Sequence, residues 1–279
     1  MRIRFVQRII DKFRNKISCL EMFADKYEGA KNNDFETMII GSSHLANAYR
    51  TIKGEYNFAI PSQDLYYSWN LYKKYSNPNV KNIIFSFSVF TPGHNIIKCP
   101  FAKFAILYNE IFGIPYQSKE LADKKELYKD EERYRKAIKK YFSRQKLPKN
   151  YYGSYNSIKA SKKKKKDFAN DAEKHWKYGQ YKPSQMEYFI NLLNATRDNN
   201  QNLYIIIPPV TEIYKNSIPV SDILYKELYD TVKNYNHVKI FNYYDNNDFG
   251  YDDFIDGDHL NIKGGEKLTA MFRKDLANV

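Results

Sequence analysis

The sequence predicts an α/β protein of three layers, in which helices cover both faces of a doubly wound, mostly parallel sheet of five strands. Two observations predict this fold. Short apolar runs typical of buried strands alternate with segments whose apolar residues recur every three or four positions, as in amphipathic helices. Such alternation favours parallel pairing through right-handed crossovers. The 279 residues, of which 43% are hydrophobic, suffice for one such domain with a well-filled core.

The first predicted strand leads into a sharp turn that carries two serines. An apolar run from Thr37 to Ile40 ends at Gly41 and is followed by Ser42, Ser43 and a helix-like segment. Glycine permits the sharp turn, and free amides at a helix start can stabilise negative charge. A serine at this place is a candidate nucleophile. Serine is also a favourable helix N-cap, so this stretch alone leaves both interpretations open.

Two further strands are expected in the first third of the chain. They run from Tyr56 to Ile60 and from Asn82 to Ser88, with a helix from Leu65 to Tyr75 between them. The strand at residues 82–88 is almost entirely apolar, which is typical of a central strand buried on both faces.

Between about residues 96 and 185 the alternation of strands and helices stops. This part contains an apolar segment (101–112), a charged helical region (119–144) and a run of five lysines (162–166). We interpret it as a largely helical insertion with a flexible basic stretch. Because active sites of doubly wound sheets lie at the carboxyl ends of the strands, where inserted loops form lids, we expect the insertion to shape substrate choice.

The regular pattern returns after residue 185. Helices are expected at 185–196 and 221–234, and strands at 203–207 and 238–242. These elements complete a flavodoxin-like arrangement. The segment Asp256-Gly-Asp-His259 then precedes a last helix. An aspartate three residues before a histidine can orient the imidazole, which can then take a proton from a serine hydroxyl.

These two motifs resemble those of the SGNH, or GDSL-like, hydrolase superfamily, and in particular its polysaccharide-modifying bacterial members. The motifs are Gly-Ser-Ser at 41–43 and Asp-x-x-His-Leu-Asn-x-x-Gly at 256–264. The resemblance implies a catalytic triad of Ser43, Asp256 and His259, with Ser42 where the family usually has aspartate. Asp258 also flanks the histidine, but the family spacing selects Asp256, and we expect the side chain of Asp258 to point away from the imidazole.

The resemblance also implies an oxyanion hole built from the Ser43 amide, an amide after the second strand and an asparagine after the third. Ala59 and Ser62 stand where glycines are usual, and the Ser62 amide is the candidate second donor. Gly-x-Asn occurs later than expected, so the third donor is Asn95, or Ser88 replaces it, or it is missing. Each missing donor would weaken transition-state stabilisation by about 3 kcal/mol.

The resemblance therefore implies an enzyme, an esterase or acyltransferase that acts on a small acyl ester, such as an acetyl ester, of a carbohydrate or cell-surface polysaccharide. Neither a metal ion nor an organic cofactor is needed for this reaction. Two alternatives stay open. One is an SGNH-fold protein that binds glycan or lipid without catalysis, which the departures at the second and third motifs favour. The other is a basic nucleic-acid-binding protein.

The net charge of +13 indicates an acidic partner, which could be anionic lipid, anionic glycan or nucleic acid. The lysine run at 162–166 is either a solvated loop or a nucleic-acid contact, and we favour the loop because no known nucleic-acid-binding motif accompanies it. Cys19 and Cys99 have no metal-ligand spacing and provide no disulfide framework.

Residues 1–33 are predicted to form a basic amphipathic helix that precedes the hydrolase domain at 34–279. Its apolar stripe consists of Ile3, Val6, Ile10, Phe13, Ile17 and Leu20, with arginines and lysines on the other faces. The helix packs on its own domain, docks on a partner or lies on an anionic membrane. Without a signal-peptide pattern or an apolar membrane span, we predict a cytoplasmic protein that can be peripheral at the inner membrane face.

The remaining histidines are given different interpretations. His175 and His237 are interpreted as surface residues rather than metal ligands, because no second ligand lies three or four positions away. His44 is adjacent to the candidate nucleophile, where it can touch substrate. His94 lies within the atypical third motif.

Overall fold

The computed structural model describes residues 20–31, 33–118, 132–133, 135–137, 139–141, 147, 151–154, 167–180, 184–218 and 221–279. The amphipathic stripe up to Ile17, Cys19 and the lysine run at 162–166 lie outside these residues.

The sheet has five strands in the order β2-β1-β3-β4-β5, and every neighbouring pair is parallel. The strands are β1 (Thr37–Ile40), β2 (Glu55–Asn57), β3 (Asn82–Ser86), β4 (Asn202–Ile207) and β5 (Val238–Asn242). The chain leaves β1 first toward β2 and then crosses to β3 on the other side, so the strand order reverses beside β1. A ligand crevice is expected at the carboxyl end of the strands at such a reversal.

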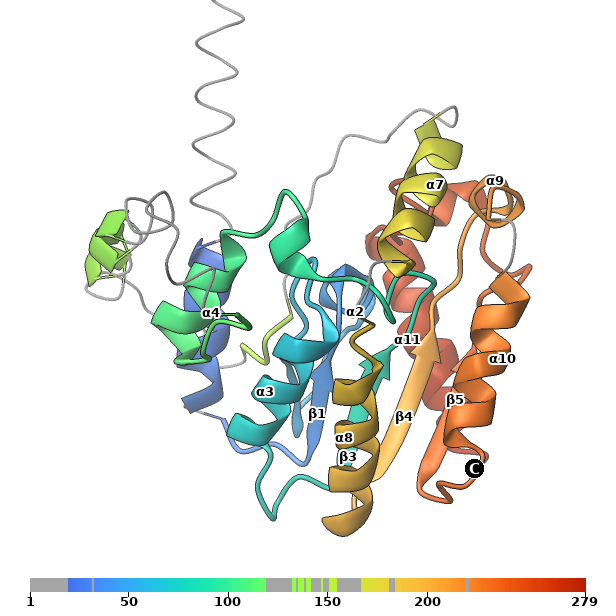
Figure 1. The fold of residues 1–279 in the computed structure, drawn as a ribbon. Coiled ribbons are helices and arrows are strands. Elements are labelled where there is room, and N and C mark those ends of the chain that lie inside the picture. The colour runs from blue at the N-terminus through green and yellow to red at the C-terminus, as the bar shows by residue number, and fades with distance from the viewer. Residues whose placement is uncertain are drawn as a thin grey trace, which may run out of the picture.

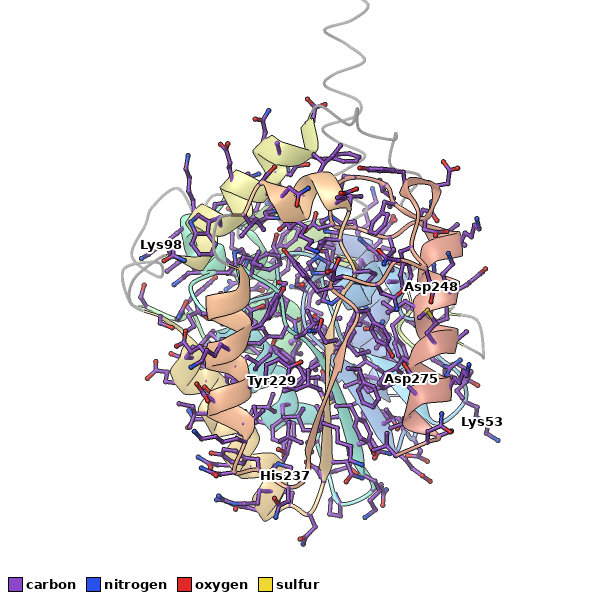
Figure 2. The ribbon with its side chains drawn as sticks, turned by 90° about the vertical axis from the view of Figure 1, so that its right-hand side faces the viewer. Lys53, Lys98, Tyr229, His237, Asp248 and Asp275 are labelled. Atoms are coloured by element: carbon purple, nitrogen blue, oxygen red, sulfur yellow. The ribbon has the colours of Figure 1, made fainter. Side chains whose placement is uncertain are left out.

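Helices cover both faces of this sheet (Figure 1), as predicted. The α-helices are α2 (Ser43–Ala48), α3 (Leu65–Tyr75), α4 (Phe104–Phe112), α7 (Phe168–Gly179), α8 (Met186–Asp198), α9 (Glu212–Asn216), α10 (Ser221–Val232) and α11 (Ile262–Leu276). Short 3-10 helices are η1 (Ile96–Lys98) and η3 (Tyr251–Asp253). Figure 2 shows the helix of Tyr229, α10, and the helix of Asp275, α11, on opposite faces of the sheet. The three-layer α/β/α fold is therefore confirmed.

The apolar strands supply two cores because successive side chains point to opposite faces. In β3, Ile83 and Phe85 join the core beneath α3 and α8, whereas Ile84 joins the core beneath α2 and α11. Met38 and Ile39 of β1 divide in the same way. Burial on both faces explains why these strands are uninterrupted apolar runs.

Residues 20–31 form a helix that packs on the domain. The ring of Phe23 is fully buried and meets Tyr108 edge-to-face, with 4.9 Å between centroids. The side chain of Lys26 is buried too, and its Nζ donates to the carbonyls of Asn57 and Gly153. These residues lie before the predicted boundary at residue 33, yet they belong to the same core as the sheet.

The predicted insertion is helical in much of its described part and ends above the sheet. Its helix α7 lies over the carboxyl ends of the strands (Figure 1). Among the described helices, none has the length and apolar character needed to cross a membrane.

Candidate active site

The structure brings together the three residues of the predicted triad. Ser43 begins α2, and its Oγ lies 2.7 Å from Nε2 of His259. On the other side of the imidazole, Nδ1 of His259 lies 2.9 Å from Oδ1 of Asp256. A hydroxyl, an imidazole and a carboxylate are thus in continuous hydrogen-bond contact, which is the arrangement that activates a serine for attack on a carbonyl.

The turn before Ser43 depends on Gly41. Its φ of +129° is disfavoured for residues with a side chain, and an added Cβ would come within 2.3 Å of the hydroxyl oxygen of Ser86. That hydroxyl accepts a hydrogen bond from the amide of Ser42 at 3.2 Å. Ser42 occupies the N-cap position, but its side chain caps no amide. Its hydroxyl instead contacts His44, so the N-cap interpretation does not explain this side chain.

A closed loop holds His259 at the other end of the site. Phe254 and Leu260 form an antiparallel bridge, and within this loop the amide of Ile255 donates to the carbonyl of His259 at 2.8 Å. Asn261 then caps α11 by accepting from the amide of Gly264 at 3.0 Å. The Asp-x-x-His-Leu-Asn motif therefore encodes a loop and a helix start as well as two candidate catalytic groups.

The glycines of this motif bring α11 close to the rest of the site. An added Cβ on Gly265 would come within 2.6 Å of the carbonyl oxygen of Ala48, at the end of α2. One on Gly264 would come within 2.2 Å of the carbonyl oxygen of Asp253. Because neither backbone oxygen can move freely, a side chain on Gly265 would push α11 away from the helix of Ser43, and one on Gly264 would push it away from η3.

Two candidate oxyanion donors border the same cleft. Ser43 is the first residue of α2, where backbone amides have no partner within the helix. Ser62 lines the cleft beside it and has a φ of +60°, a conformation that favours glycine. The carbonyl of Ser62 lies 3.1 Å from Nε2 of His94, and burial lowers the pKa of His94 to about 4. Neutral His94 can donate to this carbonyl and hold the turn in place.

The structure does not bring the other two candidates, Ser88 and Asn95, to Ser43. Ser88 contacts Thr91 through both its amide and its hydroxyl, at 2.9 and 3.2 Å. Oδ1 of Asn95 accepts from the amide of Ile97 at 3.1 Å. Neither residue lines the cleft around Ser43. Their role as donors stays a prediction that this geometry does not favour.

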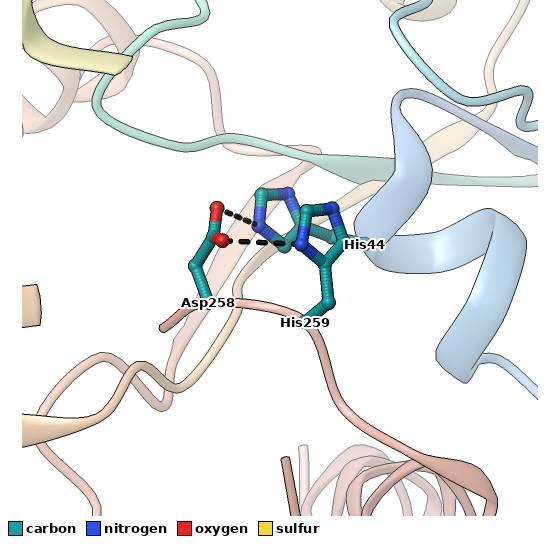
Figure 3. A group of neighbouring side chains, drawn as sticks. All are labelled: His44, Asp258 and His259. Carbon is teal, nitrogen blue, oxygen red and sulfur yellow. Dashed lines mark hydrogen bonds and ion pairs between the residues drawn. The ribbon is translucent and has the colours of Figure 1, made fainter. Parts of the chain in front are cut away.

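Asp258 differs from the expectation, because its side chain faces the imidazole. Its Oδ1 lies 3.1 Å from Nδ1 of His259, and its Oδ2 lies 3.2 Å from Nε2 of His44 and 3.1 Å from Nδ1 of His175. Figure 3 shows the carboxylate in contact with the rings of His44 and His259. The amide of Asp258 donates to Asp256, which turns the loop so that both carboxylates face inward.

The interpretation of His175 as a surface residue is also wrong, because most of its side chain is buried. Only 17% of its side chain is exposed, and its Nδ1 also lies 2.9 Å from the hydroxyl of Tyr214. Its partners are distant in sequence, so no local spacing could have indicated this contact.

The two carboxylates favour the charged form of His259. Burial alone would lower the pKa of His259, but the charges of Asp258 and Asp256 outweigh it and raise this pKa well above its usual range. Burial would raise the pKa of Asp258, but His259 and His175 hold it well below its usual range. The pKa of His44 is lowered, chiefly by burial. These shifts favour the charged form of His259 and the neutral form of His44.

His44, Asp258 and His259 offer three possible metal-ligand atoms within 4.8 Å of one another. The rings of His44 and His259 are nevertheless stacked, with centroids 5.1 Å apart and planes inclined by 10° (Figure 3). An imidazole binds a metal in the plane of its ring, and two parallel planes share no common point. This geometry suits ion pairs between Asp258 and the two histidines better than the coordination of one metal ion by all three side chains.

Ser43 and His259 open into a cleft of about 280 Å³. Aromatic side chains contribute much of its wall, namely Phe90, Phe101 and Tyr178. Helix α7 provides one side of the cleft through Asp171, Lys174, His175 and Tyr178, which share a face of the helix. Asn47, one turn after Ser43 on α2, also lines the cleft. In the sequence, only its position four residues after Ser43 indicates that Asn47 could line the cleft.

No protein-family model matches this chain, and no curated protein matches it.

Proposed function

We propose that this protein is a serine-dependent esterase or acyltransferase of the SGNH type. The observation that carries the proposal is the contact of Ser43 with His259 and of His259 with Asp256, at 2.7 and 2.9 Å, at the mouth of a cleft. The cleft lies at the carboxyl ends of parallel strands, where doubly wound folds bind ligands.

In the proposed reaction, Ser43 attacks the carbonyl of an ester while neutral His259 takes the hydroxyl proton. Asp256 holds the imidazole and stabilises the imidazolium that forms. The amides of Ser43 and Ser62 are the proposed donors to the oxyanion. His259 then gives its proton to the leaving alkoxide. The acyl group passes from Ser43 to water or to another hydroxyl, with His259 acting first as base and then as acid.

The proposed substrate is a small acyl ester, such as an acetyl ester, of a carbohydrate or a cell-surface polysaccharide. The aromatic walls of the cleft support this choice, because flat rings pack well against the faces of sugars. The catalytic step as proposed uses protein side chains alone, without a metal ion or an organic cofactor.

Hydrolysis of p-nitrophenyl acetate tests the proposal. The intact protein should release nitrophenol with saturation kinetics, and Ser43→Ala should abolish this activity. Acetylated oligosaccharides, offered with and without an alcohol acceptor, then separate hydrolysis from transfer. Absence of turnover on every ester by a protein with a normal folding transition would contradict an enzymatic function.

A second candidate function is that of an SGNH-fold protein that binds glycan or lipid without catalysis. The observation that favours it is the placement of Ser88 and Asn95 away from the cleft, which leaves the third oxyanion donor unassigned. Binding of acetylated glycans without turnover, measured by calorimetry, would support this candidate. Nucleic-acid binding has weaker support, because no known nucleic-acid-binding motif accompanies the lysine run at 162–166.

The proposed location is the cytoplasm, with attachment to the inner face of the membrane through residues 1–19. Its support is the basic amphipathic pattern of that segment.

A further inference from the structure

Asp258 is a buried carboxylate that the proposed reaction does not use. Its side chain is 1% exposed and contacts three imidazoles that come from different parts of the fold. His44 belongs to α2, His175 belongs to α7, and His259 lies in the loop before α11. A single carboxylate thus joins the helix of the nucleophile, the loop of the general base and the inserted wall of the cleft.

Ser42, His44 and Asp258 form a second serine–histidine–aspartate series of contacts beside the triad; we call it the second relay. Nδ1 of His44 lies 3.1 Å from the hydroxyl of Ser42, and Nε2 lies 3.2 Å from Asp258. Ser42 is buried and does not line the cleft, so it has no access to substrate. This relay therefore has a structural role. It fixes the ring of His44 parallel to that of His259, at 5.1 Å between centroids.

His175 connects the carboxylate of Asp258 to helix α7 of the insertion. Nδ1 of His175 contacts both Asp258 and the hydroxyl of Tyr214 on α9, against which α7 packs. The ring of Phe90 contacts both His44 and His175, with centroids at 5.6 and 5.2 Å. A shift of α7 would therefore disturb the surroundings of Asp258 directly.

We propose that Asp258 is a positioning residue that couples the position of α7 to the orientation and charge of His259. This inference rests on the proposed function, because it assigns His259 the role of general base. Binding of a substrate against α7 would alter the surroundings of a carboxylate whose Oδ1 lies 3.1 Å from Nδ1 of His259, so that occupation of the cleft would affect the proposed general base.

Other titratable groups also face this cluster. They are Asp256 on the same loop, Asp171, Lys174 and Tyr178 on α7, His94 before η1, Tyr214 on α9 and Tyr225 on α10. Asp256 contacts the imidazole directly. Any change measured at His259 must therefore be compared between variants that leave these groups intact.

Nuclear magnetic resonance of the full chain with ¹⁵N-labelled histidine tests the proposal. The protein has five histidines, so single substitutions can assign each ring. We expect the titration midpoint of His259 to lie above that of an ordinary histidine, and Asp258→Asn to lower it by about one unit or more. His175→Phe keeps a ring of similar size but removes a partner of Asp258. The carboxylate then interacts more with His259, whose midpoint should rise.

The control is His237→Gln, since His237 contacts Thr196 at the other end of the fold. It should leave the His259 midpoint unchanged. Opposite shifts in Asp258→Asn and His175→Phe would support the coupling, because loosening of the whole site would not produce them. Hydrogen exchange provides a second measurement. His175→Phe should speed exchange in α7 by about tenfold or more and leave α11 protected.

An unchanged midpoint in Asp258→Asn, or unchanged exchange of α7 in His175→Phe, would overturn the inference. Neither measurement uses catalysis, so an inactive protein would contradict the proposed function and leave the coupling intact. Conversely, an active enzyme with an unchanged midpoint would contradict the coupling alone.

Discussion

Oδ1 of Asp256 accepts from the amides of Asp258 and His259 as well as from the imidazole, at 3.3, 2.9 and 2.9 Å. Burial would raise the pKa of this carboxyl, but the charge and hydrogen bonds of His259 lower it. The carboxylate therefore stays ionised, holds Nδ1 protonated and leaves Nε2 to face Ser43.

We predict that Asp256→Asn lowers kcat for ester hydrolysis by about 10⁴-fold, because an amide does not hold the imidazole in the required tautomer. Steady-state kinetics with p-nitrophenyl acetate measure this change. Asp258→Asn is the matched control, because it makes the same substitution at the other aspartate of this loop. A larger loss in that control would transfer the role of the triad acid to Asp258.

The raised pKa of His259 predicts an alkaline activity profile. A general base must be neutral, and an imidazole whose pKa lies above its ordinary value keeps its proton to a higher pH. The kcat/KM of ester hydrolysis should therefore rise with pH through a midpoint above 6.5, the ordinary value for histidine. Rates measured from acid to alkaline pH check this prediction, and a profile already flat at pH 6 would contradict it.

The contact of Ser43 with His259 and of His259 with Asp256 could be predicted from sequence because these residues lie in two short motifs. Asp256 and His259 are close in the chain, and the turn after the first strand identified Ser43. The cluster around Asp258 could not be predicted in this way. Its partners, His44 and His175, come from separate helices that only the folded sheet brings together.

At the scale of elements, the helix of residues 20–31 is joined to the sheet by a buried lysine. Nζ of Lys26 donates to the carbonyl of Asn57 at 2.7 Å and to that of Gly153. Burial lowers the pKa of Lys26 from 10.5 to about 7, partly offset by Asp25. A neutral amine has two hydrogens, which match these two carbonyls.

This lysine predicts a stability that rises with pH. Between pH 7 and pH 10.5 the unfolded chain binds a proton at Lys26 that the folded protein releases, so the free energy of unfolding increases across this window. The gain from this residue is on the order of 4 kcal/mol. Urea unfolding at several pH values should show the slope, and Lys26→Met should remove most of it. An equal slope in the variant would contradict a lowered pKa.

The elements themselves were predicted well where apolar periodicity was strong. The five strands and their parallel order follow from alternating strands and helices. The second strand is shorter than predicted, since β2 spans Glu55–Asn57 and the chain then turns toward Ser62. That turn is set by tertiary hydrogen bonds, such as that from His94 to Ser62, which periodicity does not report.

At the scale of the whole molecule, the core extends to Leu20, whose side chain is buried. Removal of residues 1–19 should therefore leave the folding transition and activity on a soluble ester intact. The intact protein should sediment with anionic liposomes at low salt, where each basic side chain near the surface contributes about 1 kcal/mol, and should be released at high salt.

The truncated protein should not bind these liposomes. Failure of the intact protein to bind at low salt would instead indicate that the amphipathic segment packs on protein. A loss of ester hydrolysis on truncation would show that the segment contributes to the active site.

The central claim is that Ser43 is an activated nucleophile, and labelling by a fluorophosphonate tests it most directly, because only an activated serine reacts. We predict that the probe modifies the intact protein at Ser43, as located by mass spectrometry. Ser43→Ala should abolish labelling, and Ser42→Ala should retain most of it, since the hydroxyl of Ser42 is buried against His44. Equal loss in both variants, or no labelling of a folded wild-type protein, would contradict the claim.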